Sequence, residues 1–498
     1  MIVSISTPGG IEASLLTVYL LMALLAAGAS LAARELKLLL VALIHGGAGA
    51  LTILASDLIT LLIAWELLTL SAYAIIRLAG RESRSAAFWY LAAQISAAAL
   101  FFVAIAIHAG ATGSLAVEPL IPAAAPFMLL ALLIKTAMMP LHGWLVGSYT
   151  RAPLIGSFVL SAYATKVGVY TAARTLSFES LGAPLLTYIG AVMAVVAVIA
   201  ALRQHSARKL LSYHIISQVG YMLAGVGLAP ETAGVTAGLF HAVNHIIYKG
   251  LLFLVAAVAI DHFGHDDLRR MGGLSKRMPL VFLCAVVGAA AIVGVPGTSG
   301  YVSKELLKKS VGELGTVLLI AASVGTALSF TKFLYLIFGR RSATAPAAPD
   351  NAPAVAHHRA TTSAAGDHAA APGRRERGLP ASATRPGLLA LAAASILIGL
   401  LPRVVPGVPG EGYYELSSVL WGVVPAVAGG LLWFPLRSGL VRAGRTRREE
   451  PALRGYLSHL FVPILLALRG SYRIEPQRAI SVAVAGLFSL VILLVYLV

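Results

Sequence analysis

Long uncharged runs constrain this 498-residue chain more than any other feature. The stretch from Ile11 to Ala33 holds no basic residue and a single acid, Glu12, and the stretch from Ala479 to Val498 holds no charge at all. A run of about 20 apolar residues, folded as an α-helix, matches the hydrocarbon thickness of a bilayer. The runs therefore predict transmembrane helices.

The composition indicates many such helices. Hydrophobic residues make up 58% of the chain and charged residues 12%, against roughly 25% charged in an ordinary globular protein. We predict an all-α polytopic membrane protein with about 14 transmembrane helices and a lipid-facing apolar surface. The predicted spans are 12–33, 36–55, 57–79, 85–108, 121–145, 153–173, 183–202, 209–228, 233–260, 279–298, 301–338, 387–402, 417–436 and 479–498.

Two segments do not fit one simple span. The stretch 301–338 is too long, and we expect it to hold a short half-helix followed by a full helix. Segment 453–470 has a charged flank, so it either crosses the membrane or lies along its surface.

The charge distribution predicts the orientation in the inner (cell) membrane. The formal net charge is +17, which in a soluble protein would suggest a nucleic-acid partner. Membrane topology explains it better, because basic residues concentrate in cytoplasmic loops. Alternating spans place most basic residues on one side, so we predict an outside N-terminus and no nucleic-acid partner. These residues are Arg34, Lys37, Arg77, Arg81, Arg84, Arg151, Arg203, Arg208, Lys209, Arg269, Arg270, Lys276, Arg277, Arg340, Arg341, Arg442, Arg445, Arg447 and Arg448.

Several chemistries are excluded by the residues that are missing. One cysteine, Cys284, rules out a disulfide framework and a cysteine-ligated iron–sulfur site. No phosphate-binding loop of the G-x-x-x-x-G-K-[ST] type occurs. We expect no cofactor in this chain, so its energy source would be an ion gradient or a partner subunit.

The stretch 341–386 differs from the rest in composition. It is rich in Ala, Pro, Ser, Thr and His and poor in large apolar residues. Such a segment cannot bury enough surface to offset the entropy of ordering, so we predict a disordered cytoplasmic loop. His357, His358 and His368 lack a nearby Cys or acidic cluster, which favours loose histidines over a metal site.

We single out three ionisable residues in the middle of predicted spans. They are Glu66, Lys135 and Lys166. A charge in hydrocarbon costs several kcal/mol, so such residues usually face a bundle interior or a wet cavity and mark ion pathways. The alternative is a residue near a helix end that reaches the interface, but a short Glu side chain at mid-span cannot reach far.

A further set lies on one helix face. His241, His245 and Lys249 are spaced i, i+4 and i+8, about one turn apart. A proton could step along this row through intervening waters. H-x-x-x-H is also a zinc spacing, but no Glu follows the first His as in metalloproteases, so no metal site is predicted.

Two places indicate discontinuous helices. Lys135 is followed by Pro140, and the stretch from Gly294 to Gly300 precedes Lys304. Proline removes a backbone donor and glycine loosens a helix. A lysine beside such an interruption in each half of the chain is the pattern expected of inverted repeats in transporters.

Six motifs together resemble one family. They are Trp65-Glu66-Leu67 with Ser71 and Tyr73; Lys135 with Pro140-Leu141-His142-Gly143-Trp144-Leu145; Lys166; Arg208-Lys209 with Ser212-Tyr213 and Ser217-Gln218-Val219-Gly220-Tyr221; His241, His245 and Lys249; and Gly300-Tyr301-Val302-Ser303-Lys304. Over about residues 36–340 the chain is similar to the antiporter-like subunits of complex I, membrane-bound hydrogenases and Mrp-type sodium/proton antiporters.

Within this family, the sequence most resembles the D subunits of Mrp antiporters. The details are Ser148-Tyr149 with Ala152-Pro153, Thr165 to Tyr170, and Tyr213 to Gln218. Two features depart from the family: only two spans precede the Trp-Glu helix instead of four, and the loop 341–386 is extra. The resemblance divides the chain into N-terminal helices (1–56), two antiporter-like repeats (57–202 and 203–340), the loop (341–386) and C-terminal helices (387–498).

The resemblance implies a proton relay. Glu66 would pair with Lys135, and protons would pass through Lys166, Lys209 and the face of His241, His245 and Lys249 to Lys304. We expect a subunit of a multisubunit Na⁺/proton antiporter, with other membrane subunits, protons, Na⁺ and lipid as partners. The alternatives are a proton-pumping subunit of a complex I-like NADH/quinone oxidoreductase or membrane-bound hydrogenase, without redox centres of its own, and a non-conducting scaffold or small-solute permease.

Overall fold

The computed structural model describes residues 4–176, 182–228, 233–339, 379–408 and 412–442. These residues form helices joined by short loops, and they contain no strand beyond three isolated bridges. Nine of the described helices are long and apolar enough to cross a membrane, and two shorter apolar helices accompany them. The predicted all-α polytopic membrane fold is confirmed.

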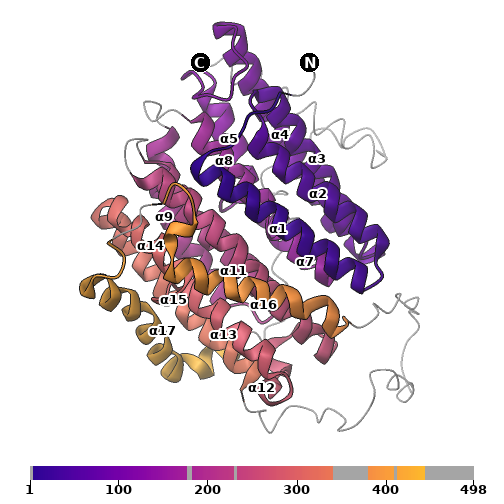
Figure 1. The fold of residues 1–498 in the computed structure, drawn as a ribbon, viewed down its shortest axis with the longest axis vertical. Helices are drawn as coiled ribbons and strands as arrows, with labels where there is room; N and C mark the ends of the chain where they lie inside the picture. The colour runs from indigo at the N-terminus through magenta and orange to yellow at the C-terminus, as the bar shows by residue number, and fades with distance from the viewer. Residues whose placement is uncertain (1–3, 177–181, 229–232, 340–378, 409–411, 443–498) are drawn as a thin grey trace, which may run out of the picture.

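The chain starts with four long helices. They are α1 (Gly10–Ala32), α2 (Leu36–Leu54), α3 (Leu58–Arg77) and α4 (Arg84–Thr112), with the short 3-10 turn η1 (Arg81–Ser83) before α4. Each packs against the next. Asp57 caps α3, because its carboxylate accepts from the backbone N–H of Thr60 at 2.8 Å. In Figure 1 these indigo helices lie together on one side of the bundle.

Four short helices follow, and they contain the first interruptions. They are α5 (Ala125–Lys135), α6 (Gly143–Tyr149), α7 (Leu154–Leu160) and α8 (Ala164–Thr175). The break between α5 and α6 confirms the interruption predicted at Pro140. The predicted span 153–173 contains a further break that was not predicted, because α7 ends at Leu160 and α8 begins at Ala164.

The centre of the bundle is α11 (Ala233–Phe263), which contacts α1, α7, α10, α13, α14 and α16 (Figure 1). The helices α9 (Gly182–Leu202) and α10 (Ala207–Val226) precede it. They approach closely through glycines: a Cβ added to Gly190 would lie 2.6 Å from the carbonyl oxygen of Gly220. Small residues at such crossings are typical of membrane helix packing.

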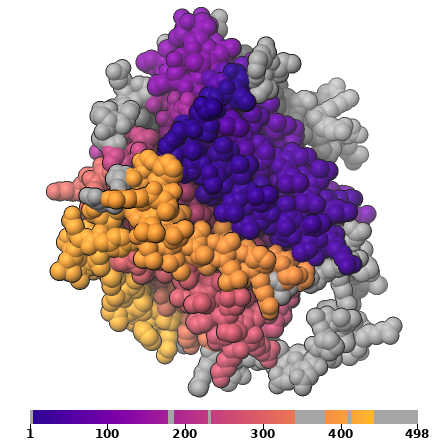
Figure 2. Space-filling view, in the orientation of Figure 1, coloured from indigo at the N-terminus to yellow at the C-terminus, as the bar shows by residue number. Residues whose placement is uncertain are grey.

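The remaining helices cover α11 from the other side. They are η2 (Leu268–Arg270), α12 (Leu274–Arg277), α13 (Pro279–Val293), α14 (Ser299–Ser310), α15 (Gly312–Phe338), α16 (Ala381–Leu400), η3 (Pro402–Val404) and α17 (Leu416–Arg442). The α13–α14 break and the half-helix α14 before α15 were both predicted. Figure 2 shows α16, in orange, running against α1, in indigo, on the viewed face.

Some predictions need correction or lie outside the described residues. The helix α16 begins at Ala381, within the predicted loop 341–386, because the helix continues through Pro386 instead of starting after it. Residues 340–378, segment 453–470 and the predicted span 479–498 lie outside the described part of the chain.

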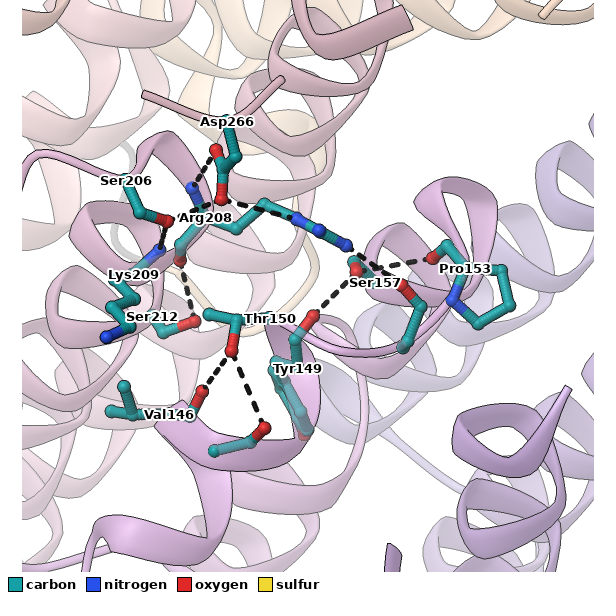
Figure 3. A network of polar contacts seen from close by, with 12 residues as sticks. Val146, Tyr149, Thr150, Pro153, Ser157, Ser206, Arg208, Lys209, Ser212 and Asp266 are labelled. Carbon is teal, nitrogen blue, oxygen red and sulfur yellow. Dashed lines mark hydrogen bonds and ion pairs between the residues drawn. The ribbon is translucent and has the colours of Figure 1, made fainter. Parts of the chain in front are cut away.

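Arg208 and Lys209, in the first turn of α10, lie at what we call the basic end of the bundle, and Figure 3 shows the polar contacts around them. Arg208 donates to the carbonyl of Ala152 at 2.9 Å and lies 3.6 Å from the carboxylate of Asp266. Ser206 joins this network by a short hydrogen bond to Asp266. Loops from distant parts of the sequence therefore meet at the end that the sequence assigns to the cytoplasm.

Candidate functional site

Lys135 lies at the last position of α5, where the helix stops inside the membrane region. The stop is a Schellman-type turn: Met138 N–H donates to Leu133 O at 2.9 Å, and Ala137 takes the left-handed conformation with φ +57°. Trp144 of α6 also ties this end in place, since its indole N–H donates to Ile134 O at 2.9 Å, a carbonyl that accepts from Ala137 N–H as well. The break thus holds the end of α5, with its lysine, in the protein interior.

The Lys135 ammonium is fully buried and has no hydrogen-bond partner. It lies 4.6 Å from the centroid of the Trp65 ring, a cation–π contact. Trp65 is held in turn by a hydrogen bond of 3.2 Å from its indole N–H to the hydroxyl of Thr171. The tryptophan of the predicted Trp-Glu motif therefore packs against the ammonium of this lysine.

Glu66 follows Trp65 on α3 and interacts electrostatically with Lys135. No ion pair within 4.0 Å joins these two described residues, and the Glu66 Oε1 atom is buried without a hydrogen-bond partner. The Glu66 carboxylate and the Lys135 ammonium therefore interact over a longer distance, and the Trp65 ring lies beside the ammonium.

Lys166 lies in the first turn of α8, directly after the unpredicted break. Its ammonium donates to the carbonyl of Ser161 at 2.5 Å, a carbonyl exposed by the end of α7. Lys166 interacts electrostatically with His245 and Lys249 of α11. The break therefore supplies the partner that this buried lysine needs.

The predicted face of α11 is present and fully buried. His241 bonds through Nδ1 to the Ser303 hydroxyl at 2.8 Å and through Nε2 to the Gln218 oxygen at 3.1 Å. Neither ring nitrogen of His245 nor the ammonium of Lys249 has a hydrogen-bond partner. Across the described residues, no group of three or more His, Cys, Asp or Glu side chains could hold a metal ion.

Lys304, on α14, caps the broken end of α13. Its ammonium donates to the carbonyls of Ile292 at 2.7 Å and Val293 at 3.1 Å, and it lies 4.6 Å from the centroid of the Tyr221 ring. The approach of α14 requires Gly300, because a Cβ there would stand 1.8 Å from the carbonyl oxygen of Ala291.

A small cavity of about 20 Å³ lies beside Lys304, lined also by Glu305, Lys308 and Trp421. Glu305 and Lys308 form an ion pair of 2.5 Å there. A volume of this size accommodates about one water molecule.

Lys209 is the predicted site residue that the structure places apart. It occupies the first turn of α10 at the basic end of the bundle, where its backbone N–H donates to the Ser206 hydroxyl at 3.1 Å (Figure 3). Its side chain is half-buried, unlike the fully buried row on α11.

Several polar residues around the row were missed as individual candidates. Gln218 and Tyr221 were recognised only as members of a longer motif. In the structure, Gln218 contacts His241 and Tyr221 contacts Lys304. His45 of α2 was not singled out, although it is fully buried and interacts electrostatically with Lys135. A polar residue inside an apolar span is the signal that would have found it.

Comparison with known proteins agrees with the motifs. Residues 55–329 match the family model described as NADH:quinone oxidoreductase/Mrp antiporter, TM. The chain belongs to this family. The matched region contains every predicted site residue from Glu66 to Lys304.

Relatives within the family are named for different functions. The chain is 30% identical over 318 residues to the D subunit of the Na(+)/H(+) antiporter of Alkalihalophilus pseudofirmus, a match that covers 58% of this chain and 64% of the relative. It is also 30% identical over 300 residues to the N subunit of the NADH-quinone oxidoreductase of Desulforudis audaxviator, covering 56% of this chain and 60% of the relative. The chain thus spans less than two thirds of the length of either relative.

Solved structures share the family fold. The Mrp complex from Dietzia sp. DQ12-45-1b contains a chain that is 24% identical, with a TM-score of 0.68 and coverage of 87% of this chain and 85% of that one. An archaeal membrane-bound sulfane sulfur reductase gives 23% identity, a TM-score of 0.61 and coverage of 81% and 77%. These likenesses show the common arrangement of helices.

Proposed function

We propose that this protein is a proton-translocating subunit of a multisubunit Na⁺/proton antiporter. The observation that carries the proposal is the buried series of ionisable side chains from Glu66 and Lys135 through Lys166 and α11 to Lys304. Charged or protonatable groups at membrane depth are costly, so a series of them favours a pathway over a scaffold.

The first step of the proposed relay depends on Glu66. Its carboxylate charge favours the protonated form of Lys135, whose ammonium has no hydrogen-bond acceptor of its own. When Glu66 is neutralised or drawn away, only the Trp65 ring continues to stabilise that charge. Lys135 then releases its proton toward Lys166.

Water would complete the relay. Buried polar groups nearly always bond to protein or to ordered water, and Lys135, His245 and Lys249 have no protein partner. Water between these groups would connect steps that are too long for direct transfer. His241, held by Ser303 of α14, then leads to Lys304 and the adjacent cavity, where the proton would leave.

The path by which protons enter the relay would run along α4. Tyr90 interacts electrostatically with both Glu66 and Tyr149, and the hydroxyl groups of both tyrosines are buried without a hydrogen-bond partner. Tyr149 is the last residue of α6, close to the basic end of the bundle. We place that end, with its arginines, in the cytoplasm and the N-terminus outside.

Partner membrane subunits and a repeat symmetry belong to the same proposal. The relatives are named as subunits, and the similar solved chains come from complexes. The two repeats 57–202 and 203–340 would each supply one lysine at a helix break, Lys135 and Lys304.

A redox-driven proton pump is the second candidate, and the match to the quinone-oxidoreductase relative favours it at the same 30% identity. The relay would be identical, since electron carriers would reside in partner subunits. The two functions differ in what drives proton movement.

The deciding experiment uses everted membrane vesicles from cells that express the chain with its neighbouring genes. Respiration establishes an internal acid pH, reported by a fluorescent weak base, and NaCl, KCl or choline chloride is then added. The antiporter predicts rapid alkalinisation of the lumen on addition of Na⁺. No response to any cation, together with proton uptake driven by NADH or another reductant, would overturn it in favour of the pump.

A further inference from the structure

His45 is a fully buried histidine of α2 that lies outside the series described above. Its Nδ1 atom is 2.8 Å from the hydroxyl oxygen of Ser71. That hydroxyl donates its one proton to the carbonyl of Leu67 at 2.7 Å, shared with Leu68 at 3.1 Å. With the hydroxyl proton on these carbonyls, Ser71 accepts from His45, and we assign the tautomer in which Nδ1 carries the proton and Nε2 keeps its lone pair.

The Nε2 atom is a buried base without a hydrogen-bond partner. Leaving such an acceptor unpaired is unfavourable, so this atom is available to a hydrogen-bond donor such as a water or an ammonium group. The same side chain interacts electrostatically with Lys135. A free acceptor is thus held near the lysine whose proton the proposed relay must pass on.

His45 also contacts the break between α7 and α8. Its ring meets the Tyr163 ring edge-on, with centroids 5.0 Å apart. Gly49, one turn further along α2, permits this approach, because a Cβ there would lie 2.4 Å from Tyr163 Cδ1. The carbonyl of Tyr163 accepts from the backbone N–H of Lys166 at 2.9 Å.

The buried series consists of two electrostatic groups. Lys135 interacts with Glu66 and His45, whereas Lys166 interacts with His245 and Lys249. The stem of Lys135 packs on α8, the helix that carries Lys166, since a Cβ added to Gly168 would be 3.1 Å from Lys135 Cγ. His45 contacts the start of the same helix through the ring of Tyr163.

We propose that His45 is a proton carrier between Lys135 and Lys166, an inference that rests on the proposed proton translocation. The Lys135 ammonium gives one proton, directly or through water, to His45 Nε2 and becomes an amine. The imidazolium then gives that proton to the neutral amine of Lys166 and returns to its starting tautomer. The Nδ1 proton stays on the bond to Ser71 throughout.

The test compares His45→Asn with His108→Asn in the vesicle assay. The asparagine amide introduced in place of His45 can still donate to Ser71 but cannot carry a proton. His108 is a matched control, a buried histidine of α4 whose Nδ1 accepts from the backbone N–H of Ile121 at 3.3 Å. We expect at least a tenfold lower rate of cation-driven proton movement in His45→Asn, normal assembly on native gels, and a change below twofold in His108→Asn.

Ser71→Ala provides a second test that leaves the imidazole in place. Without its acceptor the tautomer of His45 is no longer fixed, so transport should slow and its pH profile should shift. An assembled His45→Asn complex within twofold of wild type would overturn the carrier role. If His45→Asn does not assemble, an unchanged rate and pH profile in Ser71→Ala would overturn it instead. Wild-type vesicles without any proton movement would instead reject the proposed function itself.

Discussion

A Lys304→Met variant should be less stable than a Lys135→Met variant. Both ammonium groups lie 4.6 Å from an aromatic centroid, so the cation–π contribution is similar. They differ in hydrogen bonding: Lys304 donates to two carbonyls at the end of α13, and Lys135 has no partner.

The magnitude follows from this difference. Hydrogen bonds from a charged donor contribute about 1.5–3 kcal/mol each, so the two carbonyl bonds of Lys304 contribute about 3 kcal/mol or more. A lysine in a membrane helix costs about 3 kcal/mol, a cost that methionine removes at either site. Lys135→Met should therefore be neutral or stabilising, and Lys304→Met should be less stable than Lys135→Met by about 3 kcal/mol.

The assay is equilibrium unfolding of the purified protein in mixed micelles, titrated with sodium dodecyl sulfate. Both variants should lose transport, so stability separates the two roles where activity does not. Equal unfolding free energies for the two variants, or a less stable Lys135→Met, would refute the assignment of Lys304 as the cap of α13.

Three further outcomes are expected. Gly168→Ala should cost about 1–3 kcal/mol and reduce transport, because its Cβ meets the stem of Lys135 at 3.1 Å, while Gly110→Ala, with open space, should be neutral in both assays. Burial and nearby cations lower the pKa of His205 to about 4. The stability that the neutral His205 side chain contributes should therefore fall as the pH drops from about 6.5 toward 4. Unfolding curves of His205→Gln should accordingly show less acid sensitivity than those of the wild type. Glu66→Ala should abolish ion-driven pH changes in vesicles yet assemble normally on native gels.

The sequence predicted helix interruptions only where proline or glycine marks them. Pro140 and the stretch from Gly294 to Gly300 both coincide with observed breaks. The break at Ser161 to Tyr163 contains neither residue, and it is stabilised by tertiary contacts such as the hydrogen bond that the Tyr163 hydroxyl donates to Tyr19 O at 2.8 Å. Sequence periodicity cannot reveal a bond of that kind in advance.

The buried charges were found because a charge inside an apolar run is conspicuous. The partners of these charges were not found, because which residue contacts a charge depends on the distances in the folded structure. The resemblance implied that Glu66 pairs with Lys135, but it gave no sign that the Trp65 ring would lie against the ammonium. His45 escaped notice because a neutral histidine interrupts an apolar helix less visibly than a charged residue.

Proton release by Lys135 is the central claim, and Lys135→Arg tests it most directly. Arginine keeps the charge over Trp65, but its guanidinium stays protonated at any working pH. Cation-driven proton movement should be measured in vesicles for Lys135→Arg and Lys135→Ala, with assembly checked on native gels. The relay predicts that the arginine variant assembles yet transports as poorly as the alanine variant. Near-wild-type transport by an assembled Lys135→Arg complex would contradict it.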